Sequence, residues 1–449
     1  MWKDFDSRST LGSPGRSDLG LMGVDWEERI NFDRMRRQRL QHIKDTLAKS
    51  DVDLLFVFRT EDARYSLGFR HHLGPAFVIG NATVVIANNS DPILFTQDYP
   101  QARMTMPWLA KEQLQPRANL REGVEAAREW ADRLKGLLGN ELTNKKIGVD
   151  IWTPGMAKVF EAVFPTCEFV DGYPLMLDAK RIKTIDEIEC LKAANSITEA
   201  AMHAAIESIR PGIRECEVLA IAWQTMTALG SEWTQCANIV ASGPYTAPYR
   251  RFTSDRIIRL GDPVVIDIGA CFAGYYGDFT RTVLCGDIMP SQRQRELFQG
   301  TYNALFNACD SCRPGKTTAD VYKAAQPYVL TDMLGHGAGT NPWESPHFSL
   351  MSAKTPFKIV PGIAINLEPY GGEIGVGGFR LENNLITTEA DPEIYTTYPF
   401  DERFLDDVHP LDCTTGRTSK RLWEHAARPR SGGTRGSTSG TRATSAIRS

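Results

Sequence analysis

Residues 264–283 read VVIDIGACFAGYYGDFTRTV, and this stretch decides the fold of the second half of the chain. Alternating apolar residues around central glycines are typical of a β-hairpin. Asp267 lies inside the apolar run, where a carboxylate is costly to bury unless it is paired or bound to a cation. Asp278 follows the second turn, so the hairpin would bring it alongside Asp267. The stretch therefore predicts two neighbouring carboxylates.

Three more candidate ligands follow at short strands or beside glycines. His336 lies in LGHGAG, Glu368 follows INL, and Glu382 lies in FRLENN. Four carboxylates in one pocket would repel each other unless positive charge neutralised them, and two divalent cations would do so. Four acids with one imidazole suit Mn, Fe, Co or Zn, and paired ions of this kind can activate water. The alternative to a metal site is that these are ordinary ion-pair or turn residues. That alternative is favoured for any one of the acids alone, but not for all five residues together.

The order of predicted elements indicates an α+β fold. A basic helix from Asn31 precedes short β-branched runs and further helices, and a long helix ending before Arg210 precedes the strand-rich segment. Four regions are expected: a disordered arm at 1–27, an N-terminal domain at 28–180, a catalytic domain at 181–405 and a basic tail at 406–449. From Thr414 onward the tail holds eight Lys or Arg and one acid, which predicts disorder; an anionic partner or a gene-prediction artefact are the alternatives.

Composition excludes several classes of protein. The chain has 449 residues, with 51 Lys and Arg against 55 Asp and Glu, so no global charge favours nucleic acid. No run approaches the roughly 20 apolar residues that span a bilayer, and the polar start lacks the centre of a signal peptide. Nine scattered cysteines do not resemble a disulfide framework. We therefore expect a soluble cytoplasmic enzyme with no membrane partner.

The motifs together resemble a known family. VIDIGACFAGYYGDFTRT, GHGAGTNPWESP, INLEP and RLEN resemble the pita-bread metallopeptidases, which include methionine aminopeptidase, aminopeptidase P, prolidase and creatinase. VDLLFVFRTEDARYSLGF at 52–69 is similar to the N-terminal domain of the aminopeptidase P and creatinase branch. The resemblance implies a creatinase-like N-terminal domain, a pita-bread catalytic domain and a homodimer. It also implies two metal ions with a bridging hydroxide, bound by Asp267, Asp278, His336, Glu368 and Glu382.

The chain departs from the peptidase pattern at two positions. Trp343 stands where the peptidases have a second histidine, and Tyr249 or Arg250 stands where a Pro-His pair is usual. An indole cannot serve as an acid, a base or a metal ligand. We expect Tyr249, Arg250 and Trp343 to shape specificity, whereas Glu344 would either act as acid or base or cap a turn.

A lyase of the same family offers a second hypothesis. Its members that cleave dimethylsulfoniopropionate are similar to this chain in GSEW, ASGPYTAPY and TTYPFD, and aromatic faces would suit a sulfonium substrate. The lyase has an extra acid near the first Asp and a catalytic Asp in place of Trp343, and both are absent here. A third hypothesis, a non-catalytic binding protein, is disfavoured by the complete ligand set.

The first hypothesis is therefore a binuclear metal-dependent hydrolase that acts on a small amide or an Xaa-Pro type peptide. Arg380 would hydrogen-bond a metal-ligand carboxylate or form a surface ion pair, since it precedes Glu382 by two residues. His71 and His72 would lie near a neighbouring subunit's pocket or in a solvated loop, and His203 would be a packed or surface residue.

Overall fold

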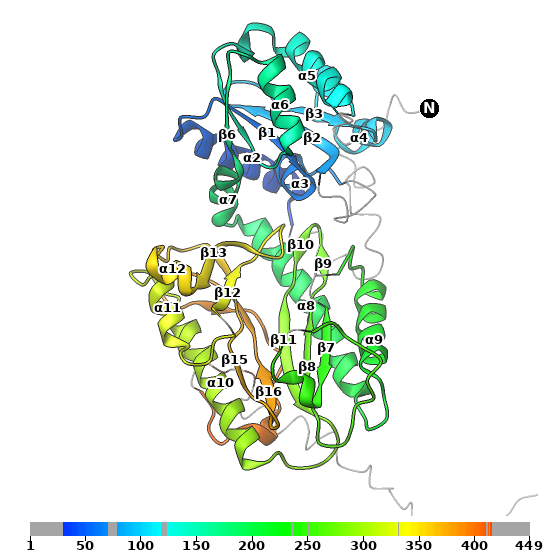
Figure 1. Cartoon of the computed structure of the whole chain (residues 1–449), viewed down its shortest axis with the longest axis vertical. Coiled ribbons are helices and arrows are strands. Elements are labelled where there is room, and N and C mark those ends of the chain that lie inside the picture. Colours follow the sequence, from blue (N-terminus) through cyan, green and yellow to red (C-terminus); the bar gives the residue numbers. More distant parts are fainter. Residues whose placement is uncertain are drawn as a thin grey trace, which may run out of the picture.

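A computed structural model of the chain describes residues 30–70, 79–117, 124–234, 238–249, 251–330, 332–409, 412 and 414. The predicted arm, the tail from residue 415, and Arg250, His71 and His72 lie outside the described residues. Figure 1 shows two lobes, with the N-terminal one above and the C-terminal one below. Helices and strands mix in both lobes, so the α+β prediction is confirmed, while the domain limits at 180 and 405 stay predictions.

The N-terminal lobe is a six-stranded mixed sheet with helices on both faces. The strands run in the order β4-β3-β2-β1-β5-β6. The strands are β1 Leu54–Arg59, β2 Ile79–Ala87, β3 Ile93–Thr96, β4 Leu114–Pro116, β5 Lys146–Val149 and β6 Glu168–Asp171. The helices are α2 Phe32–Ala48, α3 Thr60–Leu67, α4 Tyr99–Thr105, α5 Val124–Leu138, α6 Pro154–Val163 and α7 Tyr173–Arg181, with short 3₁₀ turns η2 Lys111–Gln113 and η3 Gly139–Leu142.

Strand β1 shows why this sheet needs helices on both sides. Its residues alternate between two cores: Leu55 and Val57 pack with α2 and α3, whereas Phe56 and Phe58 pack with α5 and α6. A strand covered on both faces reads as a continuous apolar run, as LLFVF does. The predicted basic helix from Asn31 is α2, and the Asn31 side chain accepts a hydrogen bond from the Arg34 amide at its N-cap.

The C-terminal lobe consists of curved antiparallel sheets between two pairs of helices. The larger sheets have the orders β11-β8-β7 and β13-β12-β14-β17-β18. The first group of strands is β7 Ile239–Ser242, β8 Pro263–Ile268, β9 Cys271–Phe272, β10 Tyr275–Tyr276 and β11 Phe279–Leu284. The second is β12 Met333–Gly337, β13 Glu344–Ser349, β14 Ala364–Leu367, β15 Tyr370–Glu373, β16 Gly377–Arg380, β17 Asn383–Ile386 and β18 Glu393–Ile394. The helices and 3₁₀ turns are α8 Ile185–Ser208, α9 Glu215–Ala228, α10 Gln292–Asp310, α11 Thr318–Ala324, α12 Leu350–Lys354, η4 Gly243–Thr246 and η5 Glu402–Phe404.

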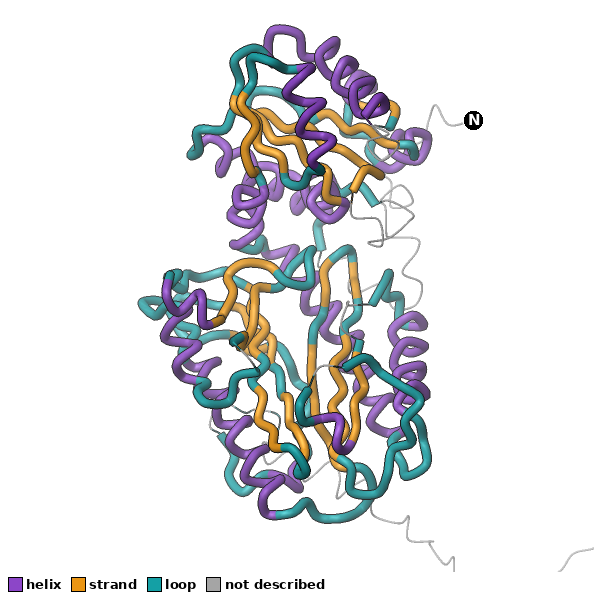
Figure 2. The backbone as a smooth tube through the Cα atoms, viewed as in Figure 1, coloured by secondary structure: helices purple, strands orange, loops and turns teal. Residues whose placement is uncertain are grey.

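Each sheet rests on its own pair of helices, which leaves the inner faces to meet. Apolar residues of α8 and α9 pack with β7, β8 and β11, and those of α10 and α11 pack with β12, β14 and β17. Figure 2 shows the strands enclosed by these helices. The two sheets are joined by backbone: the Glu382 amide donates to the Thr280 carbonyl oxygen at 3.1 Å. This junction lies in the middle of the lobe.

None of the helices in the described part of the chain is long and apolar enough to cross a bilayer.

Candidate metal centre

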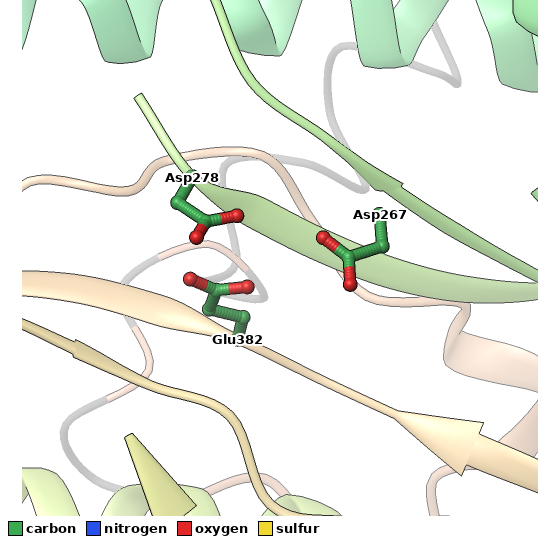
Figure 3. A group of neighbouring side chains, drawn as sticks. All are labelled: Asp267, Asp278 and Glu382. Carbon is green, nitrogen blue, oxygen red and sulfur yellow. The ribbon is translucent and has the colours of Figure 1, made fainter. Parts of the chain in front are cut away.

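Three of the predicted ligands converge where the two inner sheets meet. Asp267 lies on β8, Asp278 directly precedes β11, and Glu382 lies between β16 and β17. One carboxylate oxygen from each lies within 4.8 Å of the others, and all three side chains are buried. Figure 3 shows Glu382 facing the two aspartates from the opposite sheet. The hairpin register explains why Asp267 and Asp278 lie close together. Strands β8 and β11 are aligned so that Asp267 lies opposite Thr280, which is two residues after Asp278.

His336 and Glu368 complete the cluster from the five-stranded sheet. His336 Nε2 lies 3.6 Å from Asp278 Oδ2 and 3.8 Å from Glu368 Oε1. His336 Nδ1 lies 3.0 Å from the Gly337 carbonyl oxygen, which can only accept, so Nδ1 carries the hydrogen. Burial lowers the pKa of His336 to about 3, so the ring is neutral. The lone pair of Nε2 is therefore directed at the acids.

The cluster has the electrostatics of a cation site. Among the described residues, the buried atoms Asp267 Oδ1, Glu382 Oε1 and His336 Nε2 have no hydrogen-bond partner, and leaving such atoms unpaired is costly. Burial and the negative charge of Asp267 raise the pKa of Glu382 to about 8. Positive charge placed among these oxygens and this nitrogen would satisfy them. Asp267, Asp278 and Glu382 thus fit a divalent metal by geometry and by donor type, and His336 and Glu368 are suitable donors next to them.

The carboxylates are held in place by surrounding donors. The Tyr249 hydroxyl donates to Asp267 Oδ2 at 2.8 Å, and Thr280 Oγ1 donates to Glu382 Oε2 at 2.9 Å. Arg380 forms an ion pair with Glu368, and its Nε lies 3.7 Å from Asp267 Oδ2. Arg380 is buried, so the interpretation as a surface ion pair is wrong and the alternative, a contact with ligand carboxylates, holds.

Aromatic residues stand beside the cluster, as the sequence suggested for two of them. The Tyr249 ring stacks on Tyr370 with centroids 5.8 Å apart. Trp343 is exposed and meets the His336 ring edge-on at 6.1 Å. Tyr370 was not predicted, although it follows Glu368 in the same EPY segment. Trp343 therefore lies where it could contact a substrate, whereas Tyr249 is buried between Tyr370 and Arg380.

Glu344 has a different environment from the one that an acid or base requires. Its carboxylate is buried and lies 2.6 Å from Lys183 Nζ and 3.6 Å from Lys180 Nζ. Lys180 Nζ in turn lies 2.7 Å from Asp62 Oδ1 on α3. Burial alone would raise the pKa of Glu344, but the two lysines lower it to about 2, so the group stays ionised. This network joins the two lobes. The turn-cap alternative agrees better with it, because Glu344 also accepts from the Asn341 amide at 3.1 Å, and the role as acid or base stays a prediction.

Comparisons with known proteins match both lobes of the chain to described families. Residues 189–389 match the family described as Metallopeptidase family M24, and residues 39–182 match the Creatinase/Prolidase N-terminal domain. A protein of Pyrococcus furiosus named Xaa-Pro dipeptidase is 33% identical over 230 residues, which cover 49% of this chain and 65% of that protein. The chain thus spans just under two thirds of that relative. A Pyrococcus horikoshii protein of the same name is 26% identical over 361 residues, covering 78% of this chain and 95% of that protein.

Solved structures show the same fold. The structure titled Xaa-Pro dipeptidase from Bacillus anthracis has a TM-score of 0.69 and 24% identity, covering 82% of this chain and 99% of the other. Prolidase from Pyrococcus furiosus has a TM-score of 0.65 and 25% identity, covering 79% of this chain and 98% of the other. Both lobes are therefore shared with these proteins.

Proposed function

We propose that the chain, whose residues 189–389 match metallopeptidase family M24, is a metal-dependent hydrolase of Xaa-Pro dipeptides. The observation that carries the proposal is the buried cluster of Asp267, Asp278 and Glu382, which lies in the segment that matches the family. The relatives reported above are named for Xaa-Pro dipeptide cleavage. They lend no support to the lyase hypothesis, and the complete ligand set argues against a non-catalytic binding protein.

Family membership implies dependence on divalent metal. We propose two ions of Mn, Fe, Co or Zn, held by Asp267, Asp278, His336, Glu368 and Glu382. When bound, such ions lower the pKa of water and polarise a carbonyl group. The protein's own part is to fix the ligands through the donors described above and to bury them. Burial excludes competing water and strengthens each electrostatic contact.

The remaining residues would select the substrate. Trp343 presents an exposed aromatic face beside His336, and a proline ring is a suitable apolar partner for it. Tyr249 is buried, so it would act on specificity through its contact with Asp267. Arg250 stays a predicted specificity residue, because it lies outside the described residues. A homodimer is also proposed from the family resemblance, and light scattering on the purified full chain would test it.

The test is turnover by chelator-treated protein reloaded separately with each metal. Release of proline from Xaa-Pro dipeptides would be followed by proton NMR, with Pro-Xaa and Xaa-Ala dipeptides as controls and dimethylsulfoniopropionate in the same mixture. We expect proline from Xaa-Pro only. Asp278→Ala and Glu382→Ala should lose bound metal and turnover together, whereas Asp391→Ala, at an exposed acid, should keep both. Acrylate without proline, or full metal content in either site variant, would refute the proposal.

A further inference from the structure

His347 is an exposed histidine on β13, directly opposite His336 on β12. Residues that face each other across an antiparallel pair point to the same side of the sheet, with Cβ atoms about 4.5–5.5 Å apart. His336 points into the acidic cluster. His347 therefore lies on the face of the sheet that carries the candidate metal centre.

The neighbouring residues support this direction. Phe348 lies opposite Gly335 and is buried in the core with α10 and α11, on the outer face of the sheet. Side chains alternate along a strand, so His347 belongs to the inner face. Pairing and alternation thus place His347 beside the site.

The His347 imidazole is not engaged within the protein. Across the described residues its side chain takes part in no hydrogen bond or ion pair, in contrast to the other donors near the cluster. The Tyr249 hydroxyl is committed to Asp267, Thr280 Oγ1 to Glu382, and Arg380 to Glu368. A neutral imidazole still carries one N–H, and a protonated one carries two. His347 can therefore donate a hydrogen bond to a bound molecule in either state.

Peptide hydrolysis needs such a donor, because negative charge develops on the oxygen of the scissile carbonyl group. Resting on the proposed function, we propose that His347 is a catalytic residue whose imidazole N–H donates a hydrogen bond to that oxygen. The bond strengthens as the carbonyl oxygen becomes charged, so it stabilises the transition state more than the bound substrate. No proton is transferred in this step.

The test compares His347→Leu, which removes the donor, with His347→Gln, whose side-chain amide keeps one. For Xaa-Pro dipeptides, His347→Leu should lower kcat by about 100- to 1000-fold, as for other lost oxyanion donors, with KM within about threefold. His347→Gln should recover at least about tenfold of that loss. Metal content and melting temperature should not change, since the side chain is exposed. His203→Leu, at an exposed histidine on α8, is the matched control and should retain full activity.

A binding measurement separates this proposal from the proposed function. A phosphinate isostere of an Xaa-Pro dipeptide has a tetrahedral centre with a charged oxygen, and its affinity for metal-loaded protein can be measured by calorimetry without turnover. His347→Leu should weaken phosphinate binding at least about tenfold and leave proline binding unchanged. If the wild-type protein cleaves no Xaa-Pro dipeptide, the proposed function fails, and the phosphinate still decides the role of His347. Equal phosphinate affinities, a kcat within threefold of wild type, or a rise in KM alone would each overturn the proposal.

Discussion

Tyr249→Phe should weaken metal binding without disturbing the fold. The substitution removes only the hydroxyl, whose hydrogen bond to Asp267 Oδ2 measures 2.8 Å. The ring would keep its stacking on Tyr370. Loss of this bond would free the Asp267 carboxylate to rotate away from its present position, in which one of its oxygens lies within 4.8 Å of oxygens of Glu382 and Asp278. The expected effect is therefore on ligand orientation rather than on ligand identity.

The expected loss of metal affinity follows from the strength of this hydrogen bond and from the contacts that Asp267 keeps in the variant. A hydrogen bond to a charged acceptor is worth about 1.5–3 kcal/mol, and substitutions behind metal ligands cost about 10- to 100-fold in affinity. Arg380 Nε remains 3.7 Å from the same oxygen and would offset part of the loss. We therefore expect the lower part of that range, an affinity decrease of about 10- to 30-fold, or about 1.4–2 kcal/mol.

The assay is titration of chelator-treated protein with Mn²⁺ or Co²⁺ in competition with a metal-binding dye. Tyr370→Phe is the matched control, because its hydroxyl donates to the Thr246 carbonyl oxygen at 2.8 Å and contacts no ligand. That variant should bind metal within about threefold of the wild-type protein. If Tyr249→Phe binds metal within twofold of wild type while folding normally, the hydroxyl does not orient Asp267 and the reasoning is refuted.

Three further predictions concern the lobe junction and the substrate face. Glu344→Gln should destabilise the protein by about 3–5 kcal/mol in denaturant unfolding, because it leaves the buried Lys183 without its counter-ion. Glu393→Gln breaks an exposed pair of the same 2.6 Å length and should cost less than about 1 kcal/mol, so equal losses would contradict the argument. The pKa of Glu344 is depressed from 4.5 to about 2, so the stability that its charge contributes is present above pH 4.5 and is lost as the pH falls towards 2. When the free energy of unfolding is measured against pH, the Gln variant should lack this part of the acid dependence. Trp343→Ala should raise KM for Xaa-Pro dipeptides about three- to tenfold, because one aromatic contact with the substrate is lost. Elemental analysis should show an unchanged metal content, and an unchanged KM would mean that the substrate does not contact Trp343.

Local sequence was informative where a short segment carries its own pattern. The long helix α8 begins with a capping box at Thr184 and Glu187 and ends before Arg210, as its helix-forming residues predict. The hairpin at 264–283 likewise brings Asp267 and Asp278 together through local pairing. Both outcomes depend on contacts within about 20 residues of chain, so periodicity and turn residues were sufficient to anticipate them.

The candidate ligands could be named from sequence because buried acids in apolar strands are unusual in any fold. Their geometry could not be derived in the same way. Glu382 reaches Asp267 from the opposite sheet, and His336 reaches Asp278 from a third strand. Those approaches depend on how the two sheets pack, which no local pattern encodes.

Glu344 and His347 show most clearly what the tertiary structure decided. They lie three residues apart on one strand, yet Glu344 is buried against Lys183 and against Lys180 of α7, while His347 is exposed opposite His336. Alternation along a regular strand assigns each residue to one face of the sheet. The pairing of β12 with β13 is irregular between His336 and Gly337, so the face of Glu344 relative to that of His347 cannot be assigned by counting residues along β13. Sequence alone predicted the fold class and named the candidate donors for a metal. The roles of these two side chains followed only from the strand register and the packing of the lobes, because both depend on partners about 160 and 11 positions away along the chain.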